Sequence, residues 1–436
     1  MNIVKILVHG FLLISLSAGS FHSYGKMIAD EKSDSTLNGP EYPYYMNYSF
    51  DPDLNMRSGT ESLLSLHRGF ALLEDKFLGT TWFNENGFTG KSGGILVRLS
   101  KYILLDLPVD YFTVVFAHEY FGHGARYREF DFSPVDYGFS LPPPYGNGGG
   151  QASINLIEAI NYNINLSLWM GGLEMHQLLN RKLNLKWITT NQMNYREASL
   201  YFWSFQINMN YIQDSDEDFS IANDNDPRAY IRILNESDGY TDPDTYKFSL
   251  AQLKSRVNLN ALNPFIFYSI YAIVKTYLYD GKSSGRVPVI TIRDWRYLPL
   301  IRTSWTPFGI EYHFENYLNK NSRTYLVDLR YGDRSFTNPW AGAGIYAQNL
   351  YSYRRLNFDF YTEAWNQPEL NLDRNAGFSY EKKPGFATSV RTNYNFENFQ
   401  VPVRTFVELG YKSRGFIEGY DLNSSLIFSF GLGVAY

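Results

Sequence analysis

The segment His118–His123 (HEYFGH) places two imidazoles and a carboxylate in six consecutive residues, the parts of a zinc hydrolase site. In a regular α-helix, residues four apart share a face, as the histidines of H-E-x-x-H do, whereas residues five apart diverge by about 140°. A one-residue π-bulge absorbs the extra position, and such bulges favour functional sites. Gly122 lies inside the insertion and would give the backbone the freedom to form the bulge. The spacing therefore predicts a π-bulge that brings His118 and His123 to one ion.

This string resembles the H-E-x-x-G-H motif of the dipeptidyl peptidase III family of zinc peptidases. The resemblance covers these six residues. It implies that His118 and His123 bind zinc and that Glu119 activates water as the general base. The family takes its third ligand from a glutamate on a later helix, and Glu174 stands about as far downstream in this chain.

A catalytic zinc needs three protein ligands and one open position for water. Glu174 and His176 lie on an apolar stretch, 153–183, whose composition predicts a helix. Residues two apart on a helix point in different directions, so only one of them should face the metal. Glu174 is favoured because it completes a His/His/Glu set. His176 is then a partner of a ligand or a transition-state donor, and Glu158 is the third candidate.

Two other interpretations of the motif stay open. In the first, the histidines cap carbonyls at a helix end or pack beside Tyr120 and Phe121. In the second, Glu119 and His123 bind a metal together, because residues four apart share a helical face. That arrangement leaves His118 outside and supplies no free base.

The N-terminus predicts export. Lys5 precedes an apolar run, 6–18, and small residues follow, which is the layout of a secretory signal peptide cleaved after Ser20. The chain has no cysteine, so neither a disulfide nor a thiolate ligand is available. A net charge of −5 gives no indication of a nucleic-acid partner.

The C-terminal third alternates apolar and polar residues, as in Gly309–Glu315, Thr324–Tyr331 and Val401–Lys412. A period of two predicts strands with one apolar and one polar face. About ten such segments have the length that spans a bilayer at a tilt. The last one alternates from Leu426 and ends on Tyr436, which resembles the terminal strand of bacterial outer-membrane barrels, where it is read by the barrel assembly machinery. A soluble sandwich shows similar alternation and stays the alternative.

These observations predict an α+β protein with four parts. They are a signal peptide (1–20), a flexible leader (21–52), a mainly helical metal-binding domain (53–285) and an antiparallel β-barrel of about ten strands (286–436). The predicted function is that of a zinc metallopeptidase anchored in the bacterial outer membrane, with peptide or protein substrates and lipid around the barrel. The rival is a non-enzymatic barrel, a small channel or structural protein, with a helical plug or a periplasmic partner-binding module.

Overall fold

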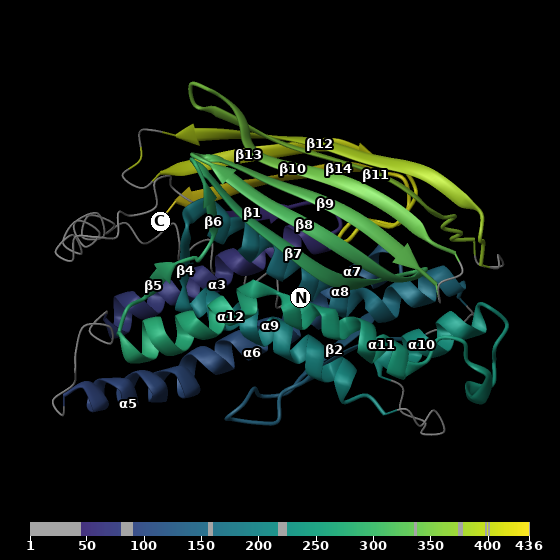
Figure 1. The fold of residues 1–436 in the computed structure, drawn as a ribbon, viewed down its shortest axis with the longest axis horizontal. Coiled ribbons are helices and arrows are strands. Elements are labelled where there is room, and N and C mark those ends of the chain that lie inside the picture. Colours follow the sequence, from purple (N-terminus) through teal and green to yellow (C-terminus); the bar gives the residue numbers. More distant parts are fainter. Residues whose placement is uncertain are drawn as a thin grey trace.

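The computed structural model describes residues 45–79, 90–155, 160–216, 225–334, 338–373, 378–396, 399 and 402–435. In these ranges, a layer of helices packs against a ten-stranded antiparallel sheet (Figure 1). The α+β prediction is therefore confirmed. The predicted signal peptide and the terminal Tyr436 lie outside the described residues.

The helical layer begins with α3 (Met56–Leu78) and continues in a nearly unbroken helical run that contains the motif. This run comprises α5 (Lys91–Lys101), the π-helical η2 (Tyr102–Asp106), α6 (Leu107–Phe116), the π-helical η3 (Ala117–His123) and α7 (Gly124–Glu129). The later helices are α8 (Tyr162–Thr190), α9 (Tyr195–Gln213), α10 (Asp226–Glu236), η4 (Pro243–Thr245), α11 (Leu250–Val257), η5 (Asn258–Leu262), α12 (Pro264–Tyr271) and η6 (Ala272–Tyr279).

The large sheet is a meander whose strands pair with their neighbours in sequence, except at one edge. Its strands are β6 (Ile290–Ile292), β7 (Trp295–Thr306), β8 (Gly309–Lys320), β9 (Arg323–Asp333), β10 (Trp340–Tyr353), β11 (Leu356–Pro368), β12 (Lys382–Phe396), β13 (Val403–Lys412), β14 (Ser425–Ala435) and β1 (Tyr45–Phe50). β1 comes from the segment that the sequence assigns to a flexible leader, and it pairs with β14 from Tyr45↔Ala435 to Phe50↔Phe430. Two small sheets pair β2 (Val135–Phe139) with β3 (Gly150–Ile154) and β4 (Gln192–Asn194) with β5 (Ser284–Arg286).

The prediction of a closed barrel is wrong, because the sheet is open. Among the described residues, β1 pairs only with β14 and β6 pairs only with β7, so the two edge strands do not meet. α3 packs along β1, and α8 packs against β7, β8 and β9. Alternation with a period of two fixes which side chains share a face but carries no information about whether the edges of a sheet join.

The sheet buries an unusual number of charged side chains. Many of its charged residues are buried, and many of its large apolar residues are exposed. The buried charged residues include Arg302, Glu311, Glu315, Asp328, Arg330, Glu363, Arg391 and Glu408. The exposed apolar residues include Ile301, Phe314, Leu329, Ile345, Phe386, Val390, Leu409, Leu426, Phe428 and Phe430.

Helices and strands nevertheless share one core at the end of the sheet near the motif. Leu166 of α8 and Ile231 of α10 belong to the same buried cluster as Trp305 and Ile310 of β7 and β8. Within the described ranges, no single helix is long and apolar enough to span a membrane. One bent pair of segments, Leu250–Leu262 and Pro264–Tyr279, meets that test jointly across a 58° bend.

Candidate metal centre

The predicted π-bulge is confirmed, because η3 is π-helical from Ala117 to His123. The wider helical turn brings the rings of His118 and His123 to 4.8 Å between centroids. Their Nε2 atoms lie 3.1 Å apart. His118 therefore belongs to the same cluster as His123.

Gly122 is needed because η3 packs closely on α8, and not because its backbone adopts an unusual conformation. Its φ is not positive. A Cβ at Gly122 would lie 2.6 Å from the Cα of Gly172 on α8, and a Cβ at Gly172 would lie 2.3 Å from the ring of His118. Both distances are far shorter than a van der Waals contact, so η3 and α8 touch along these two glycines. This contact fixes the position of the His118 ring.

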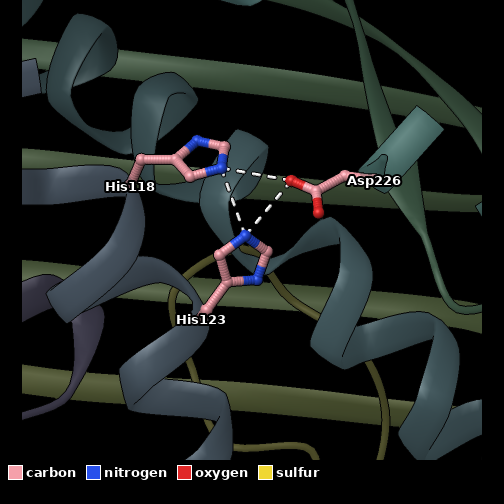
Figure 2. Close-up of side chains that lie close together, drawn as sticks. All are labelled: His118, His123 and Asp226. Atoms are coloured by element: carbon pink, nitrogen blue, oxygen red, sulfur yellow. Dashed lines mark hydrogen bonds and ion pairs between the residues drawn. The ribbon is translucent and has the colours of Figure 1, made fainter. Parts of the chain in front are cut away.

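Asp226 supplies the carboxylate that completes the cluster (Figure 2). Its Oδ2 lies 3.1 Å from the Nε2 atoms of both His118 and His123. Asp226 is the first residue of α10, because the side chain of Asn225 caps this helix by accepting a hydrogen bond from the backbone N–H of Arg228. The backbone N–H of Asp226 donates to the Tyr211 hydroxyl at 3.2 Å, which holds the carboxylate in place.

The sequence does carry a signal for Asp226. Asn225-Asp226-Pro227 is a helix N-cap followed by an acidic residue and a proline in the first turn. This signal is weak, because the stretch 213–227 around it is rich in Asn and Asp, a composition that predicts a loop.

Glu174, the favoured third ligand, is not in this cluster. Its carboxylate accepts hydrogen bonds from Arg126 Nη2 at 2.6 Å and from the backbone N–H of Gly419 at 2.7 Å. Through these two bonds, Glu174 joins the motif helix to the loop between β13 and β14. Arg126 also donates to Glu129 at 2.7 Å. A carboxylate held by a buried guanidinium is not free to bind a metal. Glu158, the third candidate, lies outside the described residues.

His176 contacts a histidine of the cluster, as one of its predicted roles requires. Its Nε2 lies 3.1 Å from His118 Nδ1, and its Nδ1 lies 3.1 Å from Ser204 Oγ. Burial, followed by the nearby imidazole of His118, holds the pKa of His176 well below its usual range. A neutral His176 can accept a hydrogen bond from His118 Nδ1–H, which directs the Nε2 lone pair of His118 toward Asp226.

The donor chemistry of the cluster fits a cation. His123 Nδ1–H donates to the backbone oxygen of Leu168 at 2.7 Å, so the Nε2 lone pair of neutral His123 points at Asp226 and His118. Three convergent acceptors repel one another unless a positive charge lies among them. Ligands about 2.0–2.1 Å from a tetrahedral zinc are about 3.3 Å apart, close to the 3.1 Å observed here.

The electrostatics of the cluster give the same preference for positive charge. Burial opposes protonation of His123, but the adjacent Asp226 carboxylate outweighs it and raises the pKa of His123 to about 9. Burial likewise opposes the charge on Asp226, and the two histidines hold its pKa well below the usual value. The cluster therefore binds a proton tightly, and a divalent cation satisfies the same geometry.

Glu119 lies beside the cluster under the hairpin formed by β2 and β3. It is buried, and a Cβ at Gly150 would lie 2.7 Å from Glu119 Cγ and 3.2 Å from its Oε1. Gly150 is therefore the residue that lets the hairpin pass over the carboxylate. The charge on Glu119 acts on His123, which places this carboxylate next to the ligand set.

Two phenols also border the site. Tyr127 donates to the backbone oxygen of Ala152 at 3.3 Å, and the ring of Tyr211 lies 6.0 Å from that of His118. Burial, and then the charges of Asp226 and Glu119, raise the pKa of both Tyr127 and Tyr211 above the ordinary value of 10.0. Both hydroxyls therefore stay protonated at neutral pH and remain hydrogen-bond donors.

A second group of metal-ligand types, His313, Glu315 and Asp328, lies on the inner face of the sheet. It is already neutralised by arginine. Arg302 Nε donates to Glu315 at 2.8 Å, and Arg181 Nη2 donates to Asp328 at 2.6 Å. These guanidinium groups occupy the positions around the carboxylates that a cation would need.

No known family model, curated protein or solved structure matches this chain. The function is therefore inferred from the metal centre and from the surface of the sheet.

Proposed function

We propose that this chain is a membrane-anchored zinc metallopeptidase whose ligands are His118, His123 and Asp226. The observation that carries the proposal is the convergence of two Nε2 atoms and one carboxylate oxygen, each 3.1 Å from the others. Two imidazoles and a carboxylate suit zinc and leave a fourth position open for water, as hydrolytic sites require. Asp226 takes the role that the sequence assigned to Glu174.

Glu119 is the proposed general base. When bound, zinc polarises the scissile carbonyl and lowers the pKa of water. Glu119 accepts the proton of the attacking water and passes it to the leaving amine. The hydroxyl of Tyr211, which remains protonated, is the proposed donor for the negative charge that develops on the carbonyl oxygen.

The sheet is the proposed membrane anchor. Its outer face exposes many large apolar side chains, and most charged residues away from the strand ends are buried. Large exposed apolar patches of this kind mark membrane or protein contact surfaces. β7 to β14 contain between 10 and 15 residues each, enough to cross a bilayer at a tilt. With the predicted signal peptide, these strands favour the bacterial outer membrane and insertion by its assembly machinery.

The peptidase proposal is tested by Glu119→Gln in the full chain, purified in detergent and loaded with zinc. Peptide cleavage should fall by about 10²- to 10⁴-fold while the zinc content stays the same, because only the base is removed. Glu236→Gln, at the far end of α10, is the matched control and should keep full activity. Cleavage is measured with a library of fluorogenic peptides, and zinc by plasma mass spectrometry.

Two results would overturn the proposal. One is a zinc-loaded wild-type protein that cleaves no peptide in the library, which would favour a structural metal. The other is unchanged cleavage by Glu119→Gln, which would place the base elsewhere.

A further inference from the structure

The helical run from α5 to α6, like the sheet, buries charged residues and exposes large apolar ones. Its charged residues Arg98, Lys101, Asp106 and Asp110 are buried, as is the partner of Asp110 on α3, His67. The opposite side of the run is apolar and exposed, at Leu96, Val97, Leu99, Ile103, Leu104 and Phe112. A surface helix in water shows the opposite arrangement.

The buried charges of this run are all partnered. Lys101 Nζ lies 2.6 Å from both Asp106 Oδ1 and Glu74 Oε1. Asp110 Oδ1 lies 2.6 Å from His67 Nε2. Ionisable residues that face the interior of a membrane protein pair with one another in this way.

A second helical face continues the first. α12 and η6 expose Phe267, Ile270, Tyr271 and Val274, spaced as one stripe along a helix, while Ser269 and Thr276 are buried. α5 packs against η6, and Arg98 Nε donates to the backbone oxygen of Leu278 at 2.9 Å. The two apolar stripes therefore lie on adjacent helices. Figure 1 shows α5 and α6 at the bottom of the helical layer, on the side away from the sheet.

The length of the apolar face matches a bilayer. From Leu96 to Phe112 the helix rises about 24 Å, close to the apolar band of about 25 Å on outer-membrane proteins. Charged and aromatic residues mark one end of this face, where Lys91 Nζ lies 3.5 Å above the ring of Tyr279. Lys275 and Asp280 form an ion pair at 2.6 Å at the same end. Such residues are typical of the membrane–water interface.

We infer that α5, η2, α6, α12 and η6 form a lipid-facing helical wall, so that acyl chains contact the molecule on its helical side as well as on its sheet. Lipid is the occupant that fits, because the wall exposes apolar side chains over the thickness of a bilayer, buries the charges along α5 to α6, and leaves exposed charges at one end. The inference rests on the membrane anchoring proposed above. It adds that the helical layer, and not the sheet alone, contacts the bilayer.

Single-cysteine variants test the wall, because the chain has no cysteine of its own and each variant is therefore labelled only at the introduced position. Leu104→Cys and Ile270→Cys place a fluorophore on the helical wall. Leu329→Cys places one on the outer face of β9, and Lys247→Cys places one at an exposed position before α11. Each labelled full chain is reconstituted in phosphatidylcholine vesicles and quenched either by doxyl groups on the acyl chains or by iodide in the water.

If lipid covers the wall, the labels at 104 and 270 are quenched several-fold more by doxyl lipid than by iodide, like the label at 329 and unlike that at 247. Iodide quenching at 104 and 270 with lipid quenching at 329 would overturn the helical wall and leave the sheet in the membrane. Protection from both quenchers would overturn it in favour of a second copy of the chain on this face. Iodide quenching at 329 as well would remove the proposed anchoring itself.

Discussion

The two histidine–carboxylate clusters of this molecule contain the same chemical groups and differ in where their positive charge comes from. At the sheet, Arg302 and Arg181 supply permanent cations to the group around His313. At the motif, Asp226 faces two imidazoles, which can share one cation from solution. The comparison teaches that ligand types at short distances do not define a metal site. An arginine within hydrogen-bond distance marks a structural network. Among the described residues no arginine is hydrogen-bonded to His118, His123 or Asp226, which favours a metal there.

The largest effect is expected from removing the metal-centre carboxylate. Asp226→Asn keeps the shape of the side chain but loses its charge, so zinc should fall from roughly one per chain to a small fraction of that. Asp328→Asn is the matched change in the sheet cluster and should leave zinc unchanged. Both are measured by plasma mass spectrometry after dialysis. Equal zinc loss in the two variants would contradict the distinction between the clusters.

Removing Arg302, which neutralises the sheet cluster, should lower the stability of the fold. Arg302→Met removes the guanidinium that binds the buried carboxylates of Glu315 and Glu418. The expected cost is about 3 kcal/mol, the lower end for a broken buried ion pair, because Arg181 still lies 3.1 Å from Glu315. The thermal midpoint in detergent should drop, and zinc content should not. Arg323→Met, at the exposed start of β9, is the control for a general loss of charge. An unchanged midpoint in Arg302→Met would show that the network contributes little.

Acid should lower the stability of the fold through Glu61 on α3, which pairs with Arg391 of the sheet and Lys182 of α8. Burial opposes its charge, but Arg391 and Lys182 outweigh burial and lower its pKa from 4.5 to about 2. Because the pKa of Glu61 is lower in the folded chain than in the unfolded chain, its ionised carboxylate stabilises the fold above pH 4.5. This stabilisation is lost as the pH falls from 4.5 through 2. The contribution is on the order of 3 kcal/mol. Glu61→Gln should flatten the dependence of the thermal midpoint on pH in this window, and an unaltered slope would assign the acid response to other groups.

The smallest effect is expected from the histidine behind the metal centre. His176→Gln removes the imidazole that contacts His118 Nδ1 and should weaken zinc binding by about 10- to 100-fold. Affinity is measured by competition with a chelator of known strength. His67→Gln removes a buried histidine that contacts Asp110 instead, and it should leave the affinity unchanged. Equal zinc affinity in the two variants would show that the contact between His176 and His118 does not support zinc binding.

Residue spacing and alternation along the chain predict the π-bulge and the strands, because these features depend on residues close in sequence. Five-residue spacing required a π-bulge between His118 and His123, and period-two alternation gave the strands and their two faces. The pairing of β1 with β14 and the open edges depend on contacts between distant segments, which a local pattern does not encode. The identity of the carboxylate in the candidate metal centre depends on such contacts too. Glu174 lies near the motif, but Arg126 binds it, whereas Asp226 reaches the histidines only through the packing of α10 on α8.

The distance along the chain between His123 and Asp226 is 103 residues, and it has a consequence for biogenesis. Before it folds, the chain already carries both histidines and the glutamate of the motif, but the proposed third ligand, the carboxylate of Asp226, arrives only when α10 docks. Under the proposed function, the peptidase is therefore latent until its fold is complete. On the same proposal, neither the unfolded chain nor any protein that handles it is exposed to a complete active site.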